Sequence, residues 1–298
     1  RTLNITSDAQ NRVYDGTNTA QVNLTDDRIL NDQLTVSGNS RFADKNVGTG
    51  KTVTTTGLSL SGVDAGNYVL ASNTATDTAD ITARTLNITS DAQNRVYDGT
   101  NTAQVNLTDD RIANDQLSVS GNSSFADKNV GTGKTVTTTG LSLSGVDASN
   151  YVLASNTATD TANITARTLN ITSDAQNRVY DGTNTAQVNL TDDRILNDQL
   201  TVSGNSRFAD KNVGTGKTVT TTGLSLSGVD AGNYVLTSNT ATDTANITAR
   251  TLNITSDAQN RVYDGTNTAQ VNLTDDRILN DQLTVSGNSR FADKNVGT

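Results

Sequence analysis

Residues 1–17 read R-T-L-N-I-T-S-D-A-Q-N-R-V-Y-D-G-T, and the same string begins again at Arg84, Arg167 and Arg250. The period is 83 residues, so the 298-residue chain holds three full repeats and 49 residues of a fourth. This period exceeds the roughly 20 to 50 residues of solenoid repeats and suffices for one small domain. We therefore expect an array of domains, with boundaries at 1–83, 84–166, 167–249 and 250–298.

The repeats are nearly identical to one another. Repeats 1 and 2 differ at five positions, repeat 3 differs from repeat 1 at two, and the partial fourth repeat matches repeat 1 throughout. This similarity within one chain indicates recent duplication. Neighbours of nearly identical sequence also carry the same surfaces, so one junction geometry is expected to recur along the chain.

Apolar and polar residues alternate within each repeat, which is the period-2 pattern of half-buried strands. The runs are short and rich in threonine, a β-branched residue that suits the exposed face of a sheet. The sequence therefore predicts an all-β fold: small β-sandwich-like modules in tandem, forming an extended rod or fibre. In repeat 1 the alternating apolar residues are Leu3 and Ile5; Ala20, Val22 and Leu24; Leu34 and Val36; Leu58 and Leu60; and Ile81 and Ala83.

Turn residues separate these runs. Asp15-Gly16 lies between residues 12–14 and residues 17–24, and Asp-Gly favours the positive φ of a type I′ hairpin turn. Gly38-Asn39 and the glycine-rich residues 48–50 are expected to separate later strands in the same way. Residues 25–33 could form a short helical turn, with Thr25 as N-cap and two aspartates, Asp26 and Asp27, in its first turn.

Two shifts in the alternation predict local geometry. Val53 and Thr55 are in phase with Gly57, whereas Leu58 and Leu60 are in the opposite phase, so we expect a bulge or bend at Gly57. At the repeat boundary, Ile81 and Ala83 are out of phase with Leu86 and Ile88, and no glycine, proline or loop-like stretch separates them. If the backbone is extended there, successive modules present their cores on opposite sides of a short, stiff connection.

The composition excludes most catalytic chemistry. The chain has no His or Cys, and all 31 acidic residues are Asp, so there is no triad base, thiolate nucleophile, or imidazole or sulfur metal ligand. No cofactor and no catalytic residue is expected. The net charge of -9 and the absence of a basic block argue against nucleic acid as a partner.

Other features of the composition concern the whole chain. No apolar run reaches the ~20 residues that span a bilayer, so no membrane insertion is expected in this segment. The absence of Met suggests a processed product or a segment of something longer. Only 20 of the first 83 residues are Val, Ile, Leu, Phe or Tyr, so each module is expected to gain stability from its neighbours. For the incomplete fourth repeat, we expect the missing strands to come from continuing chain or a neighbouring molecule, unless the folding unit is smaller than the repeat.

Several strings in a fixed order resemble a known family. They are V-Y-D-G-T (residues 13–17), F-A-D-K-N-V-G-T-G-K-T-V (residues 42–53), L-S-G-V-D-A-G-N-Y-V-L (residues 60–70), and A-D-I-T-A-R-T-L-N-I-T across the boundary. The whole chain resembles the YDG-type and MBG-type repeats of large bacterial surface adhesins, such as filamentous-haemagglutinin-like and biofilm-matrix proteins. The resemblance implies β-rich extracellular spacers in tandem, with ligand binding located in other, non-repetitive regions.

The best candidate for a metal site is the acidic cluster Asp26, Asp27 and Asp32, because Ca²⁺ requires several converging oxygen ligands. Its spacing does not match an EF-hand loop, and no Glu is present. We interpret the cluster as a solvated loop and expect no metal. Asp80 is a weaker candidate, because repeats 2 and 3 have Asn163 and Asn246 at that position.

Four other features of repeat 1 have ordinary structural interpretations. Tyr14 and Asp15 fit a core edge followed by a turn, and residues 48–52 lack the upstream glycine and following helix of a phosphate-binding loop. Lys45 and Asn46 near Asp44 could suggest a Lys–Asn crosslink, but adjacent strand residues point to opposite faces; a crosslink to a distant Asn stays open. The acceptor sequons at residues 4–6 and 23–25 matter only in a host that glycosylates them.

Three classes of function follow. The first is a non-catalytic stalk, spacer or fibre region of a secreted or surface-anchored bacterial adhesin, with neighbouring repeats and other copies of the chain as partners. The second is a module that binds polysaccharide or a host or abiotic surface weakly at each repeat, for example through Thr52, Thr54 and Thr56 on one strand face, and strongly through multivalency. The third, a hydrolase, would need paired aspartates acting alone.

Overall fold

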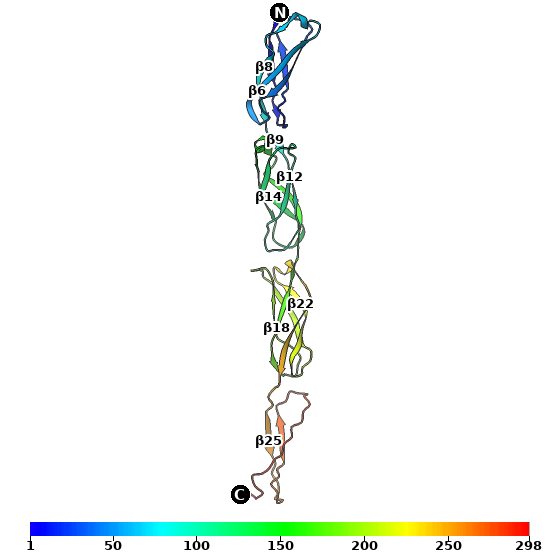
Figure 1. The fold of residues 1–298 in the computed structure, drawn as a ribbon. Helices are drawn as coiled ribbons and strands as arrows, with labels where there is room; N and C mark the ends of the chain where they lie inside the picture. The colour runs from blue at the N-terminus through cyan, green and yellow to red at the C-terminus, as the bar shows by residue number, and fades with distance from the viewer. Residues whose placement is uncertain (298) are drawn as a thin grey trace. The chain divides into compact units, whose positions relative to one another are not determined.

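The computed structural model describes residues 1–297, and within them the fold is all-β. The all-β prediction is confirmed: the first three repeats contain the same succession of eight strands and one short 3-10 helix, and the described part of the fourth contains one hairpin. Figure 1 shows the strand-rich modules along the chain. The chain forms two compact units, Arg1–Thr165 and Ala166–Thr298, each holding two consecutive repeats. No helix in the described residues is long and apolar enough to cross a membrane.

The elements follow the repeat. Repeat 1 contains β1 (Thr2–Leu3), β2 (Ile5–Ala9), β3 (Arg12–Val13), β4 (Val22–Asp26), β5 (Thr35–Phe42), β6 (Gly48–Ser61), η1 (Ala65–Asn67), β7 (Val69–Leu70) and β8 (Thr74–Thr82). Repeat 2 contains β9 (Arg84–Leu86), β10 (Ile88–Ala92), β11 (Arg95–Val96), β12 (Val105–Asp109), β13 (Ser118–Phe125), β14 (Gly131–Ser144), η2 (Ala148–Asn150), β15 (Tyr151–Leu153) and β16 (Thr157–Thr165).

The second unit repeats the pattern and then stops within a module. Repeat 3 contains β17 (Arg167–Leu169), β18 (Ile171–Ala175), β19 (Arg178–Val179), β20 (Val188–Asp192), β21 (Thr201–Phe208), β22 (Gly214–Ser227), η3 (Ala231–Asn233), β23 (Tyr234–Leu236) and β24 (Thr240–Thr248). The described part of repeat 4 contains the antiparallel pair β25 (Ile254–Ala258) and β26 (Val271–Asp275).

Each complete module has two layers. One layer is a four-stranded sheet, ordered β3-β8-β6-β5 in repeat 1, in which β3 runs parallel to β8 and the other pairs are antiparallel. The other layer is the antiparallel pair β2-β4, and the short parallel pair β1-β7 lies at the start of the module. Alternate residues of β2 and β4, such as Ala9 and Val22, pack against buried residues of the four-stranded sheet, such as Val53. This arrangement explains the period-2 pattern of the sequence.

The bulge expected at Gly57 is present. The register between β5 and β6 shifts so that Ser37 faces Ser59 but Asn39 faces Thr56, which leaves an extra residue on β6. Gly57 adopts a φ of 63°, the left-handed conformation that glycine tolerates best. As a result, Thr55 and Leu58 are both buried although their spacing along the strand is odd.

The turn expected at Gly38-Asn39 is wrong, because both residues lie inside β5. Glycine is needed at position 38 for close approach instead of a reversal of the chain. A Cβ atom there would lie 2.7 Å from Cγ2 of Thr55 and 3.0 Å from Cδ2 of Leu58. The glycine therefore allows β5 to pass beside the bulge.

The hairpin expected at Asp15-Gly16 is also wrong, although Gly16 has the predicted positive φ of 78°. The flanking segments do not pair with each other: β3 pairs with β8, and β4 pairs with β2. The chain therefore crosses between the two layers here, and Asp15-Gly16 forms part of an exposed loop at the end of the module.

The helical turn expected over residues 25–33 is absent. Thr25 and Asp26 belong to β4, and the chain turns at residues 29–32, where Asn31 has a φ of 78°. The carboxylate of Asp26 does not cap a helix, because it accepts hydrogen bonds from the side chain and backbone of Arg28. The helical turn of repeat 1 is instead η1, at residues that the sequence pattern did not single out as helical.

The phase shift at the first repeat boundary appears in the burial of the flanking residues. Ile81 and Leu86 are both fully buried although they lie an odd number of residues apart in nearly continuous extended chain. Both belong to one apolar cluster that includes Tyr14 of repeat 1 and Tyr151 of repeat 2. The cores of the first two modules are therefore in contact.

Candidate functional site: the junction between consecutive repeats

A hydrogen-bonded loop presents Tyr14 at the end of the first module. Oδ1 of Asp15 accepts hydrogen bonds from the backbone N–H of Thr17 at 2.8 Å and from its hydroxyl at 2.9 Å. The guanidinium of Arg12 donates to the other oxygen of Asp15 at 2.6 Å and lies 5.2 Å from the centre of the Phe42 ring. The V-Y-D-G-T string therefore encodes a fixed loop with the tyrosine at its base.

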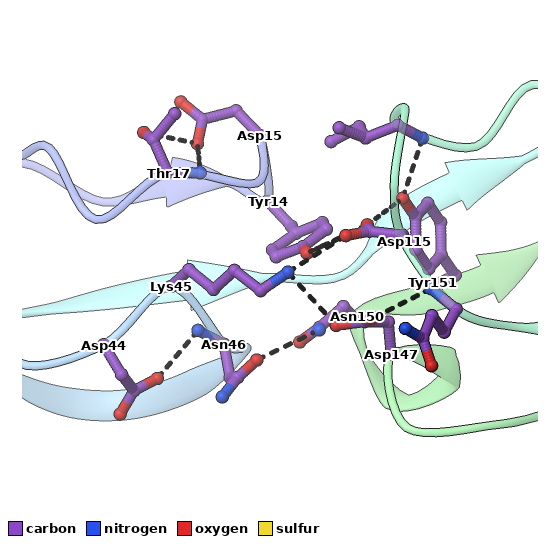
Figure 2. Close-up of polar contacts among 12 residues, drawn as sticks. Tyr14, Asp15, Thr17, Asp44, Lys45, Asn46, Asp115, Asp147, Asn150 and Tyr151 are labelled. Atoms are coloured by element: carbon purple, nitrogen blue, oxygen red, sulfur yellow. Dashed lines mark hydrogen bonds and ion pairs between the residues drawn. The ribbon is translucent and has the colours of Figure 1, made fainter.

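A second loop presents Lys45 beside Tyr14 (Figure 2). Oδ1 of Asp44 accepts a hydrogen bond from the backbone N–H of Asn46 at 2.7 Å and forms an ion pair with Nζ of Lys51 at 2.8 Å. The D-K-N string is thus a turn stabilised by its own aspartate. The turn leaves Lys45 and Asn46 pointing toward the second repeat (Figure 2).

The second repeat supplies a face that receives these two loops. A turn closed by the hydrogen bond from Asp115 N–H to Ile112 C=O, at 3.1 Å, places Asp115 beside Tyr151. The Tyr151 hydroxyl donates to Oδ2 of Asp115 at 2.6 Å and accepts from the Ile112 N–H at 2.9 Å. Asp147, just before η2, accepts from the Gln116 N–H at 2.9 Å. The face is therefore held together by contacts within repeat 2.

The two halves meet at Asp115 (Figure 2). The Tyr14 hydroxyl donates to both carboxylate oxygens of Asp115, at 3.1 and 2.9 Å, and Nζ of Lys45 lies 3.0 Å from Oδ1. Nζ of Lys45 also lies 3.2 Å from Asp147. The rings of Tyr14 and Tyr151 pack edge to face with centres 5.5 Å apart. One carboxylate, 4% exposed, thus receives donors from both repeats.

A second contact lies beside the first. Oδ1 of Asn150 accepts a hydrogen bond from the Val47 N–H at 2.9 Å, and its amide donates to Oδ1 of Asn46 at 3.2 Å. The loop around Gly16 contacts Ile112, because a Cβ atom on Gly16 would lie 3.0 Å from the isoleucine side chain. These directional contacts fix the register of the two modules in the first unit.

The pKa shifts at this junction favour neutral hydroxyls on its two tyrosines, and an ionised carboxylate and ammonium on Asp115 and Lys45. Burial alone would raise the pKa of Asp115, but hydrogen bonds from Tyr151, Lys45 and Tyr14 outweigh it and hold the pKa below its usual value. Burial, followed by the hydrogen bond to Asp115, raises the pKa of Tyr151 to about 12. The interactions of Lys45 with Tyr14 and then Asp115 raise the pKa of the lysine.

The same positions meet in the second unit. The Tyr180 hydroxyl donates to Oδ1 of Asp281 at 2.6 Å, and Nζ of Lys211 lies 3.4 Å from the same oxygen. Repeat 4 has no counterparts of Asp147, Asn150 and Tyr151 within its 49 residues. We call Asp147, Asn150 and Tyr151 the second wall of the junction in the first unit. The junction in the second unit therefore contains the Tyr–Asp–Lys contact without a second wall.

The acidic residues singled out in the sequence do not form one cluster. Asp26 pairs with Arg28, Asp27 accepts hydrogen bonds from Asn4, and Asp32 accepts from the Tyr68 hydroxyl. Asp80 accepts from the Gly50 N–H at 2.7 Å, a bond that Asn163 reproduces in repeat 2. In residues 1–297 no three acidic side chains are placed to hold a metal ion.

The other candidates of repeat 1 are distributed over the module. Lys45 faces the carboxylates of Asp115 and Asp147, while the amide of Asn150 is bonded to Asn46. Nζ of Lys45 is thus paired with two carboxylates, and a crosslink to a distant Asn stays a prediction. Residues 48–52 lie in β6, consistent with rejecting a phosphate-binding loop.

The threonine ladder is larger than the sequence suggested. Thr52, Thr54 and Thr56 on β6 are each directly opposite another threonine on the antiparallel strand β8. Residues directly opposite in a sheet project to the same face, so the two strands carry a double row of threonines. The pairs are Thr52 with Thr78, Thr54 with Thr76, and Thr56 with Thr74.

Sequence reasoning noticed Tyr14 and Lys45 but missed the residues that receive them. Asp115 lies 101 positions after its partner Tyr14. Asn150 lies 104 positions after Asn46, and Tyr151 lies 137 positions after Tyr14. No local pattern links residues so far apart. The recurrence of the Tyr14 and Lys45 strings in every repeat was the available signal, because a residue at a repeated junction must itself repeat.

The pattern of the YDG domain matches four successive segments, at residues 1–76, 82–159, 165–242 and 248–298. Together these segments cover nearly the whole chain. The chain belongs to the YDG domain family. Its Tyr-Asp-Gly strings at residues 14–16 and 180–182 are the loops that form the two junctions described above. The family resemblance expected from the sequence is thus confirmed for the YDG tandem repeat.

Among curated proteins, none matches this chain. Among solved structures, the chain is similar to the crystal structure of the I9–I11 tandem from titin, at 12% sequence identity and a TM-score of 0.21. That likeness covers 83% of this YDG chain and 100% of the titin chain.

Proposed function

We propose that this YDG tandem is a structural spacer or fibre-forming region of a secreted or surface-anchored bacterial adhesin, and that it is non-catalytic. The observation that supports this function best is the junction between repeats 1 and 2. Tyr14 and Lys45 of one module bind Asp115 of the next, so two successive modules form one continuous core. A spacer requires such coupling, because freely jointed domains would not hold a defined end-to-end distance.

The composition supports the non-catalytic part of the proposal. The chain has no His, Cys or Glu, and the aspartates at the junction are engaged with tyrosine and lysine side chains. Location outside the cell follows from the resemblance to adhesin repeats, as does the adhesin context.

Small-angle X-ray scattering tests the spacer directly. A single compact globule of 298 residues would have a radius of gyration of roughly 19 Å, whereas modules of about 30 Å arranged end to end would give roughly 32 Å. We expect the larger value for the monomeric chain. A variant with Asp115→Ala and its equivalent Asp281→Ala should give a broader distribution of lengths. A radius near the compact value for the unaltered chain would contradict the spacer.

One observation favours a second function, a multivalent module for polysaccharide or another regular surface. The double row of threonines on β6 and β8 recurs on β14 with β16 and on β22 with β24. Identical weak sites in tandem would combine into strong binding. Glycan-array binding that grows with the number of repeats would support this function over the spacer, and no binding at any repeat number would exclude it for the glycans tested.

A further inference from the structure

Each complete module holds a segment from its start and a segment from its end side by side. In repeat 1, residues 9–14 run parallel to residues 77–82. After Thr82 the chain passes through a single residue into β9 of repeat 2. We propose that this parallel pair of segments is a mechanical clamp, which gives the tandem a further function: resistance to a pulling force applied along the chain.

Hydrogen bonds link the two segments of the clamp along their whole length. β3 pairs with β8 in the middle of it. Three further bonds are donated by backbone N–H groups. They run from Ala9 to Oδ2 of Asp77 at 2.7 Å, from Asp80 to Oδ1 of Asn11 at 2.6 Å, and from Tyr14 to the carbonyl oxygen of Thr82 at 2.9 Å. The two segments are therefore bonded at both ends as well as in the centre.

The same three bonds are present in repeats 2 and 3, at the same three distances of 2.7, 2.6 and 2.9 Å. In repeat 2 they join Ala92 to Asp160, Asn163 to Asn94 and Tyr97 to Thr165, and in repeat 3 they join Ala175 to Asp243, Asn246 to Asn177 and Tyr180 to Thr248. The middle bond is donated by a backbone N–H, so the change from Asp80 to Asn163 leaves it intact. Each complete module thus carries its own clamp.

The parallel orientation decides how the clamp responds to tension. In a parallel pair the chain enters one strand and leaves the other at opposite ends, so tension slides the strands past each other and loads all of their bonds at once. An antiparallel hairpin pulled at its open end loses its bonds one after another. Hydrogen bonds act over a few ångströms, so a sliding pair separates only when several break together. The pair β1-β7, where the chain enters the module, is also parallel.

The clamp and the junction share Tyr14. The backbone N–H of Tyr14 is bonded to Thr82, and its hydroxyl is bonded to Asp115 of repeat 2. Tension on the covalent connection between these modules is therefore shared with the junction, and both are anchored at one residue. The clamp rests on the proposed spacer function for its purpose, because only a chain under tension needs it. The two are measured separately, since scattering reports length at rest and pulling reports resistance.

Pulling the chain in two directions tests the clamp, because direction changes the geometry of loading and not the stability of the fold. Held by its two ends, the full chain should lengthen in three steps of about 260 Å, the length of 83 extended residues less that of a folded module. A second chain is held by Ser118→Cys and Ser144→Cys, which face each other at the open end of the hairpin β13-β14. No other cysteine is present. We expect β13 to peel away at a several-fold lower force, and equal forces would overturn the proposal.

A variant altered in one module provides an internal control. Asp160→Ala with Asn94→Ala removes two acceptors from the clamp of repeat 2 and leaves repeats 1 and 3 unaltered. At constant force, one of the three steps should then occur about tenfold sooner than the other two. Asp127→Ala removes an acceptor for a backbone N–H in the loop between β13 and β14, and it should leave all three steps unchanged. Three unchanged steps in the clamp variant, together with the larger radius of gyration, would reject the clamp and leave the spacer intact.

Discussion

Tyr14 and Tyr180 occupy the same position in their repeats, and each donates a hydrogen bond to the equivalent aspartate of the following repeat. Tyr14 is nevertheless 1% exposed, whereas Tyr180 is only half-buried. The carboxylate that receives the bond is 4% exposed in the first junction and 18% exposed in the other. The difference is the second wall, made by Asp147, Asn150 and Tyr151, which repeat 4 does not contain.

This comparison shows how the junction is built. The Tyr–Asp–Lys contact forms with half of the receiving module, so it needs only the first part of a repeat. Exclusion of water from that contact requires residues from the second part. A hydrogen bond to a charged group contributes more to stability when it is shielded from water, so the same three residues should stabilise the two junctions by different amounts.

The largest expected effect comes from completing the fourth repeat. Appending the sequence of residues 50–83 after Thr298 restores the four-stranded sheet and the counterparts of Asp147, Asn150 and Tyr151. In the present chain the β25 side chains are all exposed. Completing the repeat should slow amide hydrogen exchange in β25 and β26 by at least about 100-fold, the change expected when a marginal hairpin joins a core. A scrambled extension of the same composition serves as the control. Unchanged exchange after completion would show that the repeat is not the folding unit.

The second-largest effect is expected from removing the shared carboxylate, and it should differ between the two junctions. Asp115→Ala leaves two tyrosine hydroxyls without their acceptor and leaves Lys45 paired with Asp147 alone. The cost should be about 3 kcal/mol, the lower end for a buried pair, because Lys45 is 37% exposed and keeps one partner. Exchange of the Ile112 and Val47 amides should accelerate about 100-fold. Asp281→Ala should accelerate exchange at its own junction much less. Equal effects at both junctions would mean that the second wall does not shield the contact.

A smaller change removes one hydroxyl. Tyr14→Phe keeps the edge-to-face ring contact but deletes the donor to Asp115, which should cost about 1.5 kcal/mol, typical of a bond to a charged acceptor. Local exchange at Val47 should then rise about tenfold. Tyr180→Phe provides the matched variant, and its effect should be smaller because water can replace the lost donor there. A larger effect at Tyr180 would reverse the interpretation.

Alkaline pH should weaken the first junction. The pKa of Tyr151 is raised from 10.0 to about 12, first by burial and then by its bond to Asp115. The stabilisation from a raised pKa is complete below the unfolded value near 10 and is lost as pH rises through the folded value. Titration followed by the ¹³C shift of the Tyr151 ring should therefore give a midpoint near 12, and a lower one in Asp115→Ala. A midpoint near 10 in the unaltered chain would show that the ring is hydrated.

The strands and the Gly57 bulge could be predicted because they depend on neighbours in the sequence. Alternation along a strand is a local pattern, and a change of phase must be absorbed by an extra residue wherever both halves are buried. The prediction at Asp15-Gly16 failed for the complementary reason. The conformation of Gly16 is local and was correct, but the pairing of β3 with β8 depends on residues almost 70 positions away.

The sequence by itself determined that the chain is an all-β tandem of four repeats with no residues for metal-thiolate or imidazole chemistry, because period, alternation and composition can be read without coordinates. Only the tertiary structure decided that Tyr14, Lys45 and Asp115 form a junction and that Asp26, Asp27 and Asp32 do not form a cluster. The physical reason is that hydrogen bonds and ion pairs act over a few ångströms. Which groups come within that distance is set by how whole modules pack, not by their spacing along the chain.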